Sequence, residues 1–404
     1  MMSSVTNLLY KAINACVPKH DRSMYVSTPY YTVSSIMDVI NCHSSNAYYF
    51  VNKYSTRMHE KKVRIYVEYL HEDRMSDYEA FAKEALNNNV ELIFVKHYRG
   101  YPNKVQSMIH RFKNLITKYK TYLWITETGD QGANGKLKTQ KVVCLNYFIS
   151  CKNDLVAGSN DRWDTIDVLM TSSLLHSQII SSSVGVRLEN CVPNGMARND
   201  SLETENMKQR IIADIEKELG YRPQFIFAYA PTYRDYEDQN SPNRDLLGYS
   251  AEGLSTFLTK NKIAFVHKLH RAQESRIVSF PKGTVKFNYC YDYSFYDLLS
   301  IADCLITDYS SIGFDFMLRD KPLIYNLYDW DIYEKDRGMS FEPYEEFCPG
   351  EIVENYDQLV RAMARIVNGE DPYKEKRDRI KKLIYKNADF ESTNRIIDYI
   401  EDML

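Results

Sequence analysis

The stretch ITDYSSIGFDFMLRDKP, residues 306–322, combines the end of an apolar strand, a turn, a short helix and the start of a second strand. Strand, helix and strand in this order form the repeating unit of α/β proteins with parallel sheets. Its apolar run is interrupted by Asp308, Ser310, Ser311 and Asp315. Since Ser311 and Asp315 are four residues apart, they share one face of a helix. The stretch therefore predicts a polar stripe on an otherwise buried helix.

Two interpretations of this stripe are open. In the structural one, Ser310 or Asp308 caps the helix, and Asp315 is a buried carboxylate held by hydrogen bonds. In the functional one, the helix start beyond a parallel strand offers free N–H groups and a positive dipole end to an anion.

Polar residues follow two other predicted strands of the second half. IAFVHKLHR ends with Lys268 and His270 on one alternating face, and FIFAYAPTYRD places Thr232 and Arg234 just past its strand. Ligands of open α/β sheets sit outside the carboxyl ends of strands. Three such ends with hydroxyls, cations and a histidine suit a nucleotide pyrophosphate. For His270 alone, the alternatives are a structural histidine or a metal pair with His267.

The whole chain extends this pattern. Its 404 residues are too many for one ordinary domain, and short apolar runs alternate with helical periods almost throughout. We therefore expect an α/β fold of two Rossmann-like domains with an inter-domain cleft. The amphipathic helix within residues 201–224 marks the boundary, which gives domains over 1–204 and 205–404. The last helix can pack back on the first domain.

The same spacing of apolar residues predicts the individual strands and helices. In the first half, the predicted strands are SMYVS (23–27), KVRIYVEYL (62–70), VELIFVKHY (90–98), TYLWITE (121–127) and KVVCLNYFIS (141–150), with a helix over 76–89. In the second half, we predict strands 225–230, 263–269, 285–288, 304–307 and 322–327, helices 250–260, 294–302 and 310–319, and a helical region over 374–404.

Composition excludes several classes of protein. The net charge of −3 gives no global sign of nucleic-acid binding. No stretch approaches the roughly 20 apolar residues that span a bilayer, and the amino terminus lacks a signal-peptide pattern. Eight scattered cysteines without a CxxC pair favour reduced thiols. We expect a cytoplasmic protein.

One segment of the first half, KHYRGYPNKVQSMIHRFKNLITKYK (96–120), is strongly basic with interleaved apolar residues. It is either a solvated basic helix or an attachment to anionic lipid or to a lipid-linked, phosphate-rich acceptor. The second interpretation predicts peripheral contact with the inner face of the cell membrane.

The segment 310–353, SSIGFDFMLRDKPLIYNLYDWDIYEKDRGMSFEPYEEFCPGEIV, resembles the CDP-glycerol:poly(glycerol phosphate) glycerophosphotransferase family, the teichoic-acid and capsule polymerases and primases of bacteria. The resemblance extends to GMARND, APTYRD and KLH, and covers roughly residues 140–370. It implies a GT-B-like transferase with an acceptor-side first domain and a CDP-alcohol-binding second domain. Such an enzyme moves glycerol phosphate or ribitol phosphate from a CDP-alcohol to a hydroxyl of a surface glycan, teichoic-acid-like polymer or capsule, releasing CMP.

The resemblance also implies which residues line the CDP-alcohol site. His270 would be catalytic, the serines would hold phosphate, Asp315 would accept a bond from a polyol hydroxyl, and Arg337 would screen phosphate charge unless it is a plain surface arginine. The full set of implied donor-binding residues is Arg198, Pro231, Thr232, Lys268, Leu269, Ser310, Ser311, Asp315 and Arg337.

One motif departs from the family pattern. The family usually ends a strand of the first half with WHG, whose histidine is the favoured general base. Here Asn146, Tyr147 and Phe148 stand in its place. Tyr147, with an ordinary pKa near 10, is poorly matched to proton abstraction at neutral pH. Either another residue deprotonates the acceptor, or the substrate differs, or transfer has been lost.

These observations leave three functions. The first is polyol-phosphate transfer with CDP-glycerol or CDP-ribitol as donor and a lipid-linked or polymeric glycan as acceptor. The second is a GT-B glycosyltransferase that uses a nucleotide sugar, and the third is a non-catalytic member that binds nucleotide or polymer. We expect no nucleic-acid partner. Because acidic residues do not cluster as in a metal site, we also expect no tightly bound metal or other cofactor, and Mg²⁺ is not indicated.

Overall fold

The chain forms two compact units, which are described separately. Unit 1 comprises Met1–Tyr147, Asn160–Arg198 and Glu391–Leu404, and unit 2 comprises Phe148–Ser159 and Asn199–Phe390. The main boundary thus follows Arg198, six residues before the predicted one. The computed structural model describes residues 21–26, 46–69, 75–96, 103–127, 136, 139–146, 149, 163–232, 234, 244–245, 247–248, 250, 252–269, 277–279, 281–287 and 293–404.

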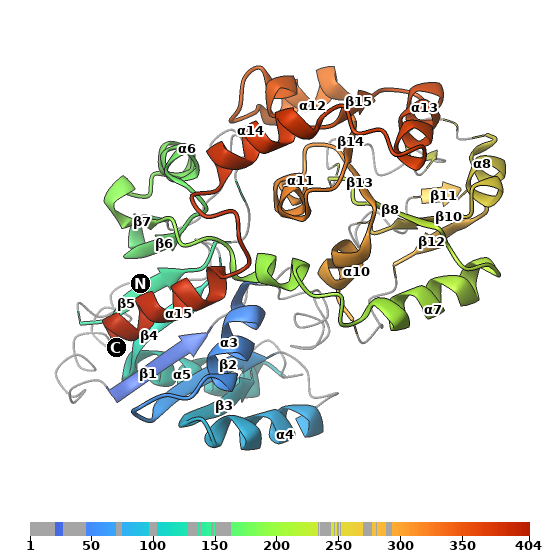
Figure 1. Cartoon of the computed structure of the whole chain (residues 1–404). Helices are drawn as coiled ribbons and strands as arrows, with labels where there is room; N and C mark the ends of the chain where they lie inside the picture. Colours follow the sequence, from blue (N-terminus) through green and yellow to red (C-terminus); the bar gives the residue numbers. More distant parts are fainter. Residues whose placement is uncertain are drawn as a thin grey trace. The chain divides into compact units, whose positions relative to one another are not determined.

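Unit 1 contains a parallel sheet of seven strands in the order β3-β2-β1-β4-β5-β6-β7 (Figure 1). Its strands are β1 (Asp21–Val26), β2 (Val63–Tyr69), β3 (Val90–Lys96), β4 (Thr121–Thr126), β5 (Lys141–Cys144), β6 (Val168–Met170) and β7 (Cys191–Val192). Its helices are α3 (Asn46–Thr56), α4 (Met75–Leu86), α5 (Lys104–Lys120), α6 (Leu174–Val184) and α15 (Ser392–Met403), with short 3-10 turns at Trp163–Thr165 and Leu188–Asn190. A further 3-10 turn, Ala197–Leu202, spans the boundary between the two units.

Alternation along the strands builds the core of unit 1. In β2, Val63 and Ile65 point into the cluster that α3 covers, whereas Tyr66 packs on the opposite face of the sheet. Both faces are apolar because helices cover both sides of a parallel sheet. The five strands predicted in the first half are all present. The three-residue β6 and two-residue β7 were not predicted, because runs this short carry no readable alternation.

The last helix, α15, belongs to unit 1. Its isoleucines Ile396, Ile397 and Ile400 are buried in the same core cluster as α3. The start of α15 lies close to the backbone at Gly195, where a Cβ atom would overlap the Ser392 side chain. The φ of +96° at this position also suits glycine. The chain end thus completes the core that the first strands begin.

Unit 2 contains a parallel sheet of six strands in the order β12-β10-β8-β13-β14-β15 (Figure 1). Its strands are β8 (Phe225–Tyr229), β10 (Ile263–His267), β12 (Thr284–Lys286), β13 (Cys304–Thr307), β14 (Leu323–Asn326) and β15 (Glu351–Val353), and β9 (Arg244–Asp245) pairs with β11 (Ile277–Ser279). Its helices are α7 (Lys208–Leu219), α8 (Leu254–Lys260), α10 (Phe295–Ile301), α11 (Ile312–Phe316), α12 (Trp330–Arg337), α13 (Tyr356–Val367) and α14 (Lys374–Ile384), with 3-10 turns at Met317–Arg319 and Tyr344–Phe347.

The sheets of both units share the doubly wound strand order. Numbered along the chain, the strands of unit 2 run 3-2-1-4-5-6, and those of unit 1 run 3-2-1-4-5-6-7. This is the Rossmann order, in which ligands bind where the winding reverses. The predicted fold class of two Rossmann-like domains is therefore confirmed.

Local sequence accounts for α10. Ser294 and Asp297 form a reciprocal capping box, with bonds of 2.8 Å from Asp297 N to Ser294 Oγ and 2.6 Å from Ser294 N to the Asp297 carboxylate. The predicted apolar stripe is buried, with Leu298 and Leu299 at its centre.

Among the described residues, no helix is both long and apolar enough to cross a bilayer.

Candidate functional site

The three strand ends singled out in the second half are neighbours in unit 2. β10, β8 and β13 are adjacent and parallel, so their carboxyl ends meet at one edge of the sheet (Figure 1). Backbone bonds continue past the strands, from Lys268 N to Tyr229 O (2.8 Å) and from Ala230 N to Ile306 O (3.0 Å). The winding reverses between β8 and β13, where Pro231, Thr232, Ser310 and Ser311 follow the strands. This is the expected ligand position of a doubly wound sheet.

A buried hydrogen-bond network joins β8 to β13 at this point. Thr232 donates to the Asp308 carboxylate through its N–H (2.8 Å) and through its hydroxyl (2.7 Å). Tyr344 donates to the backbone oxygen of Asp308 at 2.8 Å. Asp308 is therefore not the helix cap of the structural interpretation, since its carboxylate holds the neighbouring strand end.

The helix that follows is shorter than predicted. The range 310–319 divides into α11 and a 3-10 turn, and the Ser311 side chain at the N-cap makes no capping bond. Ser310 Oγ lies 3.5 Å from Ile312 N, at the limit of a hydrogen bond. Both serines are half-buried. Their hydroxyl groups are thus only weakly engaged in capping the helix.

Arg234 contacts Asp308, just before this turn, and is 1% exposed. Its guanidinium group is 2.9 Å from the Asp308 carboxylate and donates to Asp329 at 2.7 and 3.1 Å. Burial lowers the pKa of Arg234, but the carboxylates of Asp308 and Asp329 more than offset this, and the pKa is raised. From its place in the sequence, Arg234 was one of the cations expected to bind a pyrophosphate. In the structure, two carboxylates instead neutralise its charge.

Aromatic rings enclose the guanidinium group of Arg234. It lies 5.0 Å from the ring centre of Tyr309 and 5.2 Å from that of Tyr333, and these two rings stack 3.8 Å apart. Burial raises the pKa of Tyr309, reinforced by Asp329 and Asp308, so the phenol stays protonated and donates to Asp329 (3.0 Å). The sequence analysis did not identify these residues around Arg234. The run of tyrosine and aspartate in NLYDWDIY (326–333), which contains Asp329 and Tyr333, could have indicated them.

The other predicted donor residues of unit 2 differ in their surroundings. Leu269 is 2% exposed and belongs to the core cluster, whereas Lys268 is half-buried with its ammonium group 5.3 Å from the Phe295 ring. Arg337 ends α12, is half-buried, and pairs with Asp336 at 3.3 Å. His270 lies outside the described residues. The donor-binding roles of these residues stay predictions.

Asp315 is fully buried. Its carboxylate accepts hydrogen bonds from the hydroxyls of Tyr296 (2.5 Å) and Tyr385 (3.4 Å). These bonds tie α11 to α10 and to the residue that follows α14. These two hydrogen bonds support the structural interpretation of Asp315. Its bond to a polyol hydroxyl stays a prediction.

Arg198 is the fourth residue of the GMARND motif and the last residue of this segment of unit 1. It is 3% exposed, and its N–H donates to Asn46 Oδ1 at 2.9 Å. The Asn46 amide in turn donates to the backbone oxygen of Asn146 (2.7 Å). The motif therefore fastens the start of α3 to the end of β5.

His176 completes the surroundings of Asn146 and was missed by sequence reasoning. The imidazole is fully buried, Ser172 N–H donates to its Nδ1 at 3.1 Å, and its Nε2 is 3.5 Å from the Asn146 amide. His176 supports the residue before Tyr147, which itself lies outside the described residues.

His267, at the end of β10, gives a pH prediction for the stability of unit 2. Burial and the nearby Lys286 lower the pKa of His267 from 6.5 to about 4. The unfolded chain therefore takes up this proton at a higher pH than the folded chain does. Stability should be highest above the unfolded pKa and should fall by about 3 kcal/mol as the pH drops from 6.5 to about 4. Urea unfolding of the wild type and His267→Gln across this window measures the loss. An equal loss in the variant would assign the pH dependence to other groups.

Comparison with known proteins places these features in a family. The family model described as CDP-Glycerol:Poly(glycerophosphate) glycerophosphotransferase matches residues 136–402. A teichoic acid glycerol-phosphate primase of Bacillus subtilis (strain 168) is 28% identical over 273 residues, which are 67% of each chain. The ribitol-phosphate polymerase TarL of Staphylococcus aureus (strain NCTC 8325 / PS 47) is 30% identical over 185 residues, 45% of this chain and 33% of TarL. The chain thus spans about a third of TarL.

Solved structures share the fold. The wall teichoic acid polymerase TagF matches with a TM-score of 0.68 at 17% identity, over 100% of this chain and 96% of that one. A UDP-GlcNAc 2-epimerase of Neisseria meningitidis matches with a TM-score of 0.56 at 10% identity, over 94% and 99%. The family match covers more than half of the chain and includes every motif described above. The protein belongs to the CDP-Glycerol:Poly(glycerophosphate) glycerophosphotransferase family.

Proposed function

We propose that the protein transfers glycerol phosphate or ribitol phosphate from a CDP-alcohol to a hydroxyl of a bacterial surface glycan or teichoic-acid-like or capsular polymer. The observation that carries this proposal is the position of Thr232 and Ser310. They come from separate family motifs and lie at the point in unit 2 where the winding reverses. The names of the related primase and polymerases support polyol phosphate as the transferred group.

In the proposed reaction, the acceptor oxygen bonds to the β-phosphorus of the donor. The bond from that phosphorus to the bridging oxygen breaks, and CMP leaves with the electron pair. The acceptor hydroxyl gives up its proton to the surrounding water as the new bond forms. Positioning and charge neutralisation supply most of the rate in such transfers. Ser310, Ser311 and Lys268 would hold phosphate oxygens, His270 would stabilise the pyrophosphate and the leaving CMP, and the Arg234 network would keep the turn rigid beneath them.

The acceptor of the proposed reaction is a lipid-linked or polymeric glycan. The protein would meet it at the inner face of the cell membrane, as a peripheral protein. Among the described residues, no cluster of three or more histidine, cysteine, aspartate or glutamate side chains could hold a metal ion. We propose a reaction without a tightly bound cofactor.

Release of CMP tests the proposed function. The full chain is incubated with CDP-glycerol, CDP-ribitol or a nucleotide sugar and a teichoic-acid primer, and nucleotides are separated by chromatography. Turnover of a CDP-alcohol to CMP is expected. A nucleoside diphosphate as product would identify a glycosyltransferase instead, and donor binding without turnover would identify a non-catalytic member.

Tyr147→Phe tests whether the tyrosine in place of the family histidine is a base. The change removes the hydroxyl and keeps most of the ring. We expect turnover within roughly tenfold of the wild type, because a phenol is badly matched to proton abstraction near neutral pH. A drop of about a thousandfold in kcat, with donor binding and folding intact, would instead make Tyr147 the base.

A further inference from the structure

Four buried polar side chains of unit 2 form a hydrogen-bonded row. The Asn199 amide donates to the hydroxyl oxygen of Tyr385 (3.3 Å), and this hydroxyl donates to the Asp315 carboxylate (3.4 Å). Tyr296 donates to the other oxygen of that carboxylate at 2.5 Å. Asn199 and Asp315 are fully buried, and both tyrosines are buried as well. Since the four residues come from four separate segments, the row fixes the positions of these segments relative to one another.

Tyr385 joins two motifs of the family resemblance. Asn199 belongs to GMARND (195–200), and Asp315 belongs to SSIGFD (310–315). Because Tyr385 uses its one proton for the bond to Asp315, its oxygen can only accept from Asn199. A single hydroxyl group is thus the link between the two motifs. Tyr385 itself belongs to neither motif and lies directly after α14.

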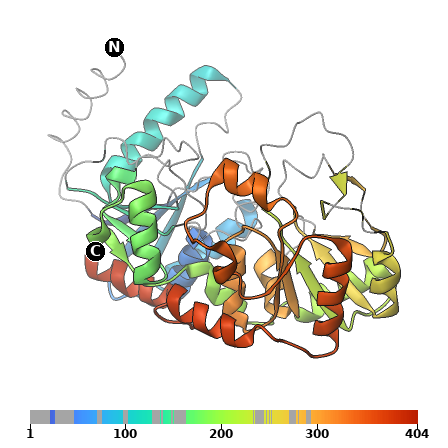
Figure 2. The same cartoon turned by 90° about the horizontal axis from the view of Figure 1, so that it is seen from above.

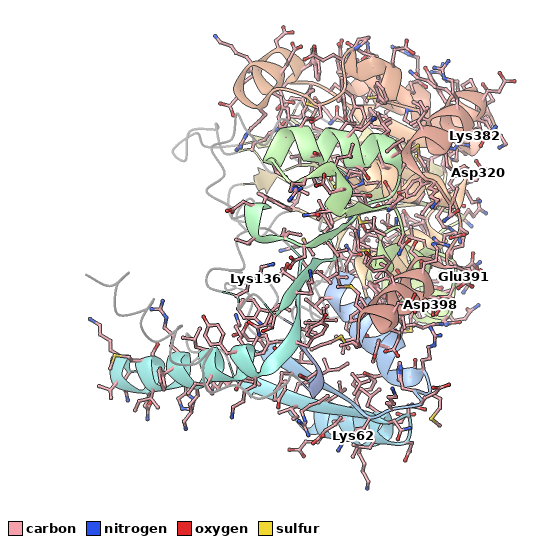
Figure 3. All side chains as sticks on the ribbon, turned by 90° about the vertical axis from the view of Figure 1, so that its left-hand side faces the viewer. Lys62, Lys136, Asp320, Lys382, Glu391 and Asp398 are labelled. Carbon is pink, nitrogen blue, oxygen red and sulfur yellow. The ribbon has the colours of Figure 1, made fainter. Side chains whose placement is uncertain are left out.

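The helix that carries Tyr385 is also fixed to the segment that carries Asp315. Past α11, Asp320 forms an ion pair of 3.4 Å with the fully buried Arg377 of α14. Helix α14, drawn in red, lies next to the 3-10 turn that follows α11 (Figure 2). In Figure 3, where both residues are labelled, Asp320 lies on the same side of unit 2 as Lys382 of α14. The Tyr385 hydroxyl is therefore presented to Asp315 from a fixed support.

Stability alone does not explain this row. Asn199 Oδ1 is buried, and it has no hydrogen-bond partner within the part of the chain that the structure describes. An unsatisfied buried amide oxygen lowers stability, and an apolar side chain would avoid that loss. Such departures are expected where a residue serves a ligand site rather than the core. Both ends of the row adjoin residues with implied donor-binding roles, since Asn199 directly follows Arg198 and Asp315 lies one turn after Ser311.

We propose that Tyr385 is a positioning residue for the CDP-alcohol. Its hydroxyl holds Asn199 and Asp315 at a fixed spacing, so that the two motifs to which they belong are ready to bind the donor. Tyr385 acts through these two residues and takes no part in the transfer itself. This role rests on the proposed function, because the donor is the CDP-alcohol of that reaction.

Tyr385→Phe tests this role, because the change removes the hydroxyl and keeps the ring. Loss of one hydrogen-bonded link changes an equilibrium constant by about three- to tenfold, so the Kd and KM of the donor should rise by that factor. The kcat should change by less than about twofold, because the lost interaction serves donor binding and not the transition state alone. Calorimetry with CDP-glycerol and CDP-ribitol gives Kd for the full chain, and CMP release gives KM and kcat.

Tyr296→Phe is the matched control. It removes a hydroxyl from the same Asp315 carboxylate but leaves the link between Tyr385 and Asn199 intact. Because the Tyr296 bond is the shorter one, at 2.5 Å against 3.4 Å, its loss should lower the melting temperature more than Tyr385→Phe does. It should nevertheless raise the donor Kd less. A merely structural row would give the same order of the two variants in both measurements.

A double-mutant cycle locates the effect in the link. Asn199→Ala should raise the donor Kd by a factor similar to that of Tyr385→Phe. The double variant should bind the donor about as weakly as either single variant, because each change breaks the same link.

Three results would overturn the positioning role while leaving the proposed function in place. They are a wild-type donor Kd in Tyr385→Phe, additive losses in the double variant, and a Kd that follows the melting temperature in all variants. If the wild type binds a CDP-alcohol but releases no CMP, the transfer is wrong and the Kd values still decide the role of Tyr385. If the wild type binds neither CDP-alcohol, both are wrong.

Discussion

Replacing Arg234 with methionine should lower the free energy of unfolding of unit 2 by about 3–5 kcal/mol. The reason is the pair of carboxylates that the guanidinium group neutralises. Asp308 and Asp329 are 1% and 8% exposed, and removal of the cation would leave two negative charges buried side by side. A hydrophobic side chain fills the space but cannot compensate the charges.

Urea unfolding measures this effect, and hydrogen exchange locates it. Protection should fall in β8, β13 and β14, whose ends the network joins, and should persist in the strands of unit 1. The matched control is Arg222→Met, which removes a surface pair with Glu216 at 3.7 Å and an arginine side chain 60% exposed. That change should cost at most about 1 kcal/mol. Equal losses in the two variants would contradict the importance of the buried network.

A partial rescue would confirm the electrostatic reason. Asp308→Asn combined with Asp329→Asn removes both buried charges, so adding it to Arg234→Met should recover part of the lost stability. If the triple variant were less stable than Arg234→Met alone, hydrogen bonding rather than charge would dominate the network.

His270→Ala should lower kcat by about a hundred- to thousandfold, the usual loss when a group that stabilises charge in the transition state is removed, without a large change in melting temperature. The motivation is its sequence position, directly after Lys268 and Leu269 past the end of β10, within the region that the family model matches. A residue at the ligand edge of a sheet can be truncated without opening a cavity in the core.

His267→Ala is the matched control, because the same change three residues earlier falls inside the sheet. His267 is 1% exposed, so its truncation should lower stability rather than chemistry. CMP release and thermal melting are measured for both variants. A His270→Ala protein that melts many degrees lower yet turns over normally would make His270 a structural residue.

The fold class and most of the site's strands could be predicted from the sequence. β8, β10, β13 and β14 were predicted within about two residues at either end, because buried parallel strands appear as apolar runs and their ends are marked by polar residues. The capping box and apolar stripe of α10 are equally local. Family motifs then indicated which strand ends matter, and the match over residues 136–402 confirmed the family.

Tertiary structure alone decided what those polar residues do. Arg234 and Asp308 are 74 residues apart in the chain, so no local pattern could show that they neutralise each other. Leu269 reads as part of a ligand motif, but its side chain is a core residue. Asp315 finds its tyrosine partners on two other segments, one 19 and one 70 residues away.

Local sequence also leaves undecided whether the apolar faces of α5 and α15 are buried. Helical periodicity shows that a helix has an apolar face, but it cannot show whether anything covers that face. On α15 the face is buried against α3, at the opposite end of the chain, whereas the corresponding face of α5 is exposed over its first turns. Burial depends on which distant segments meet. That is set by the packing of the whole unit rather than by the sequence of either helix.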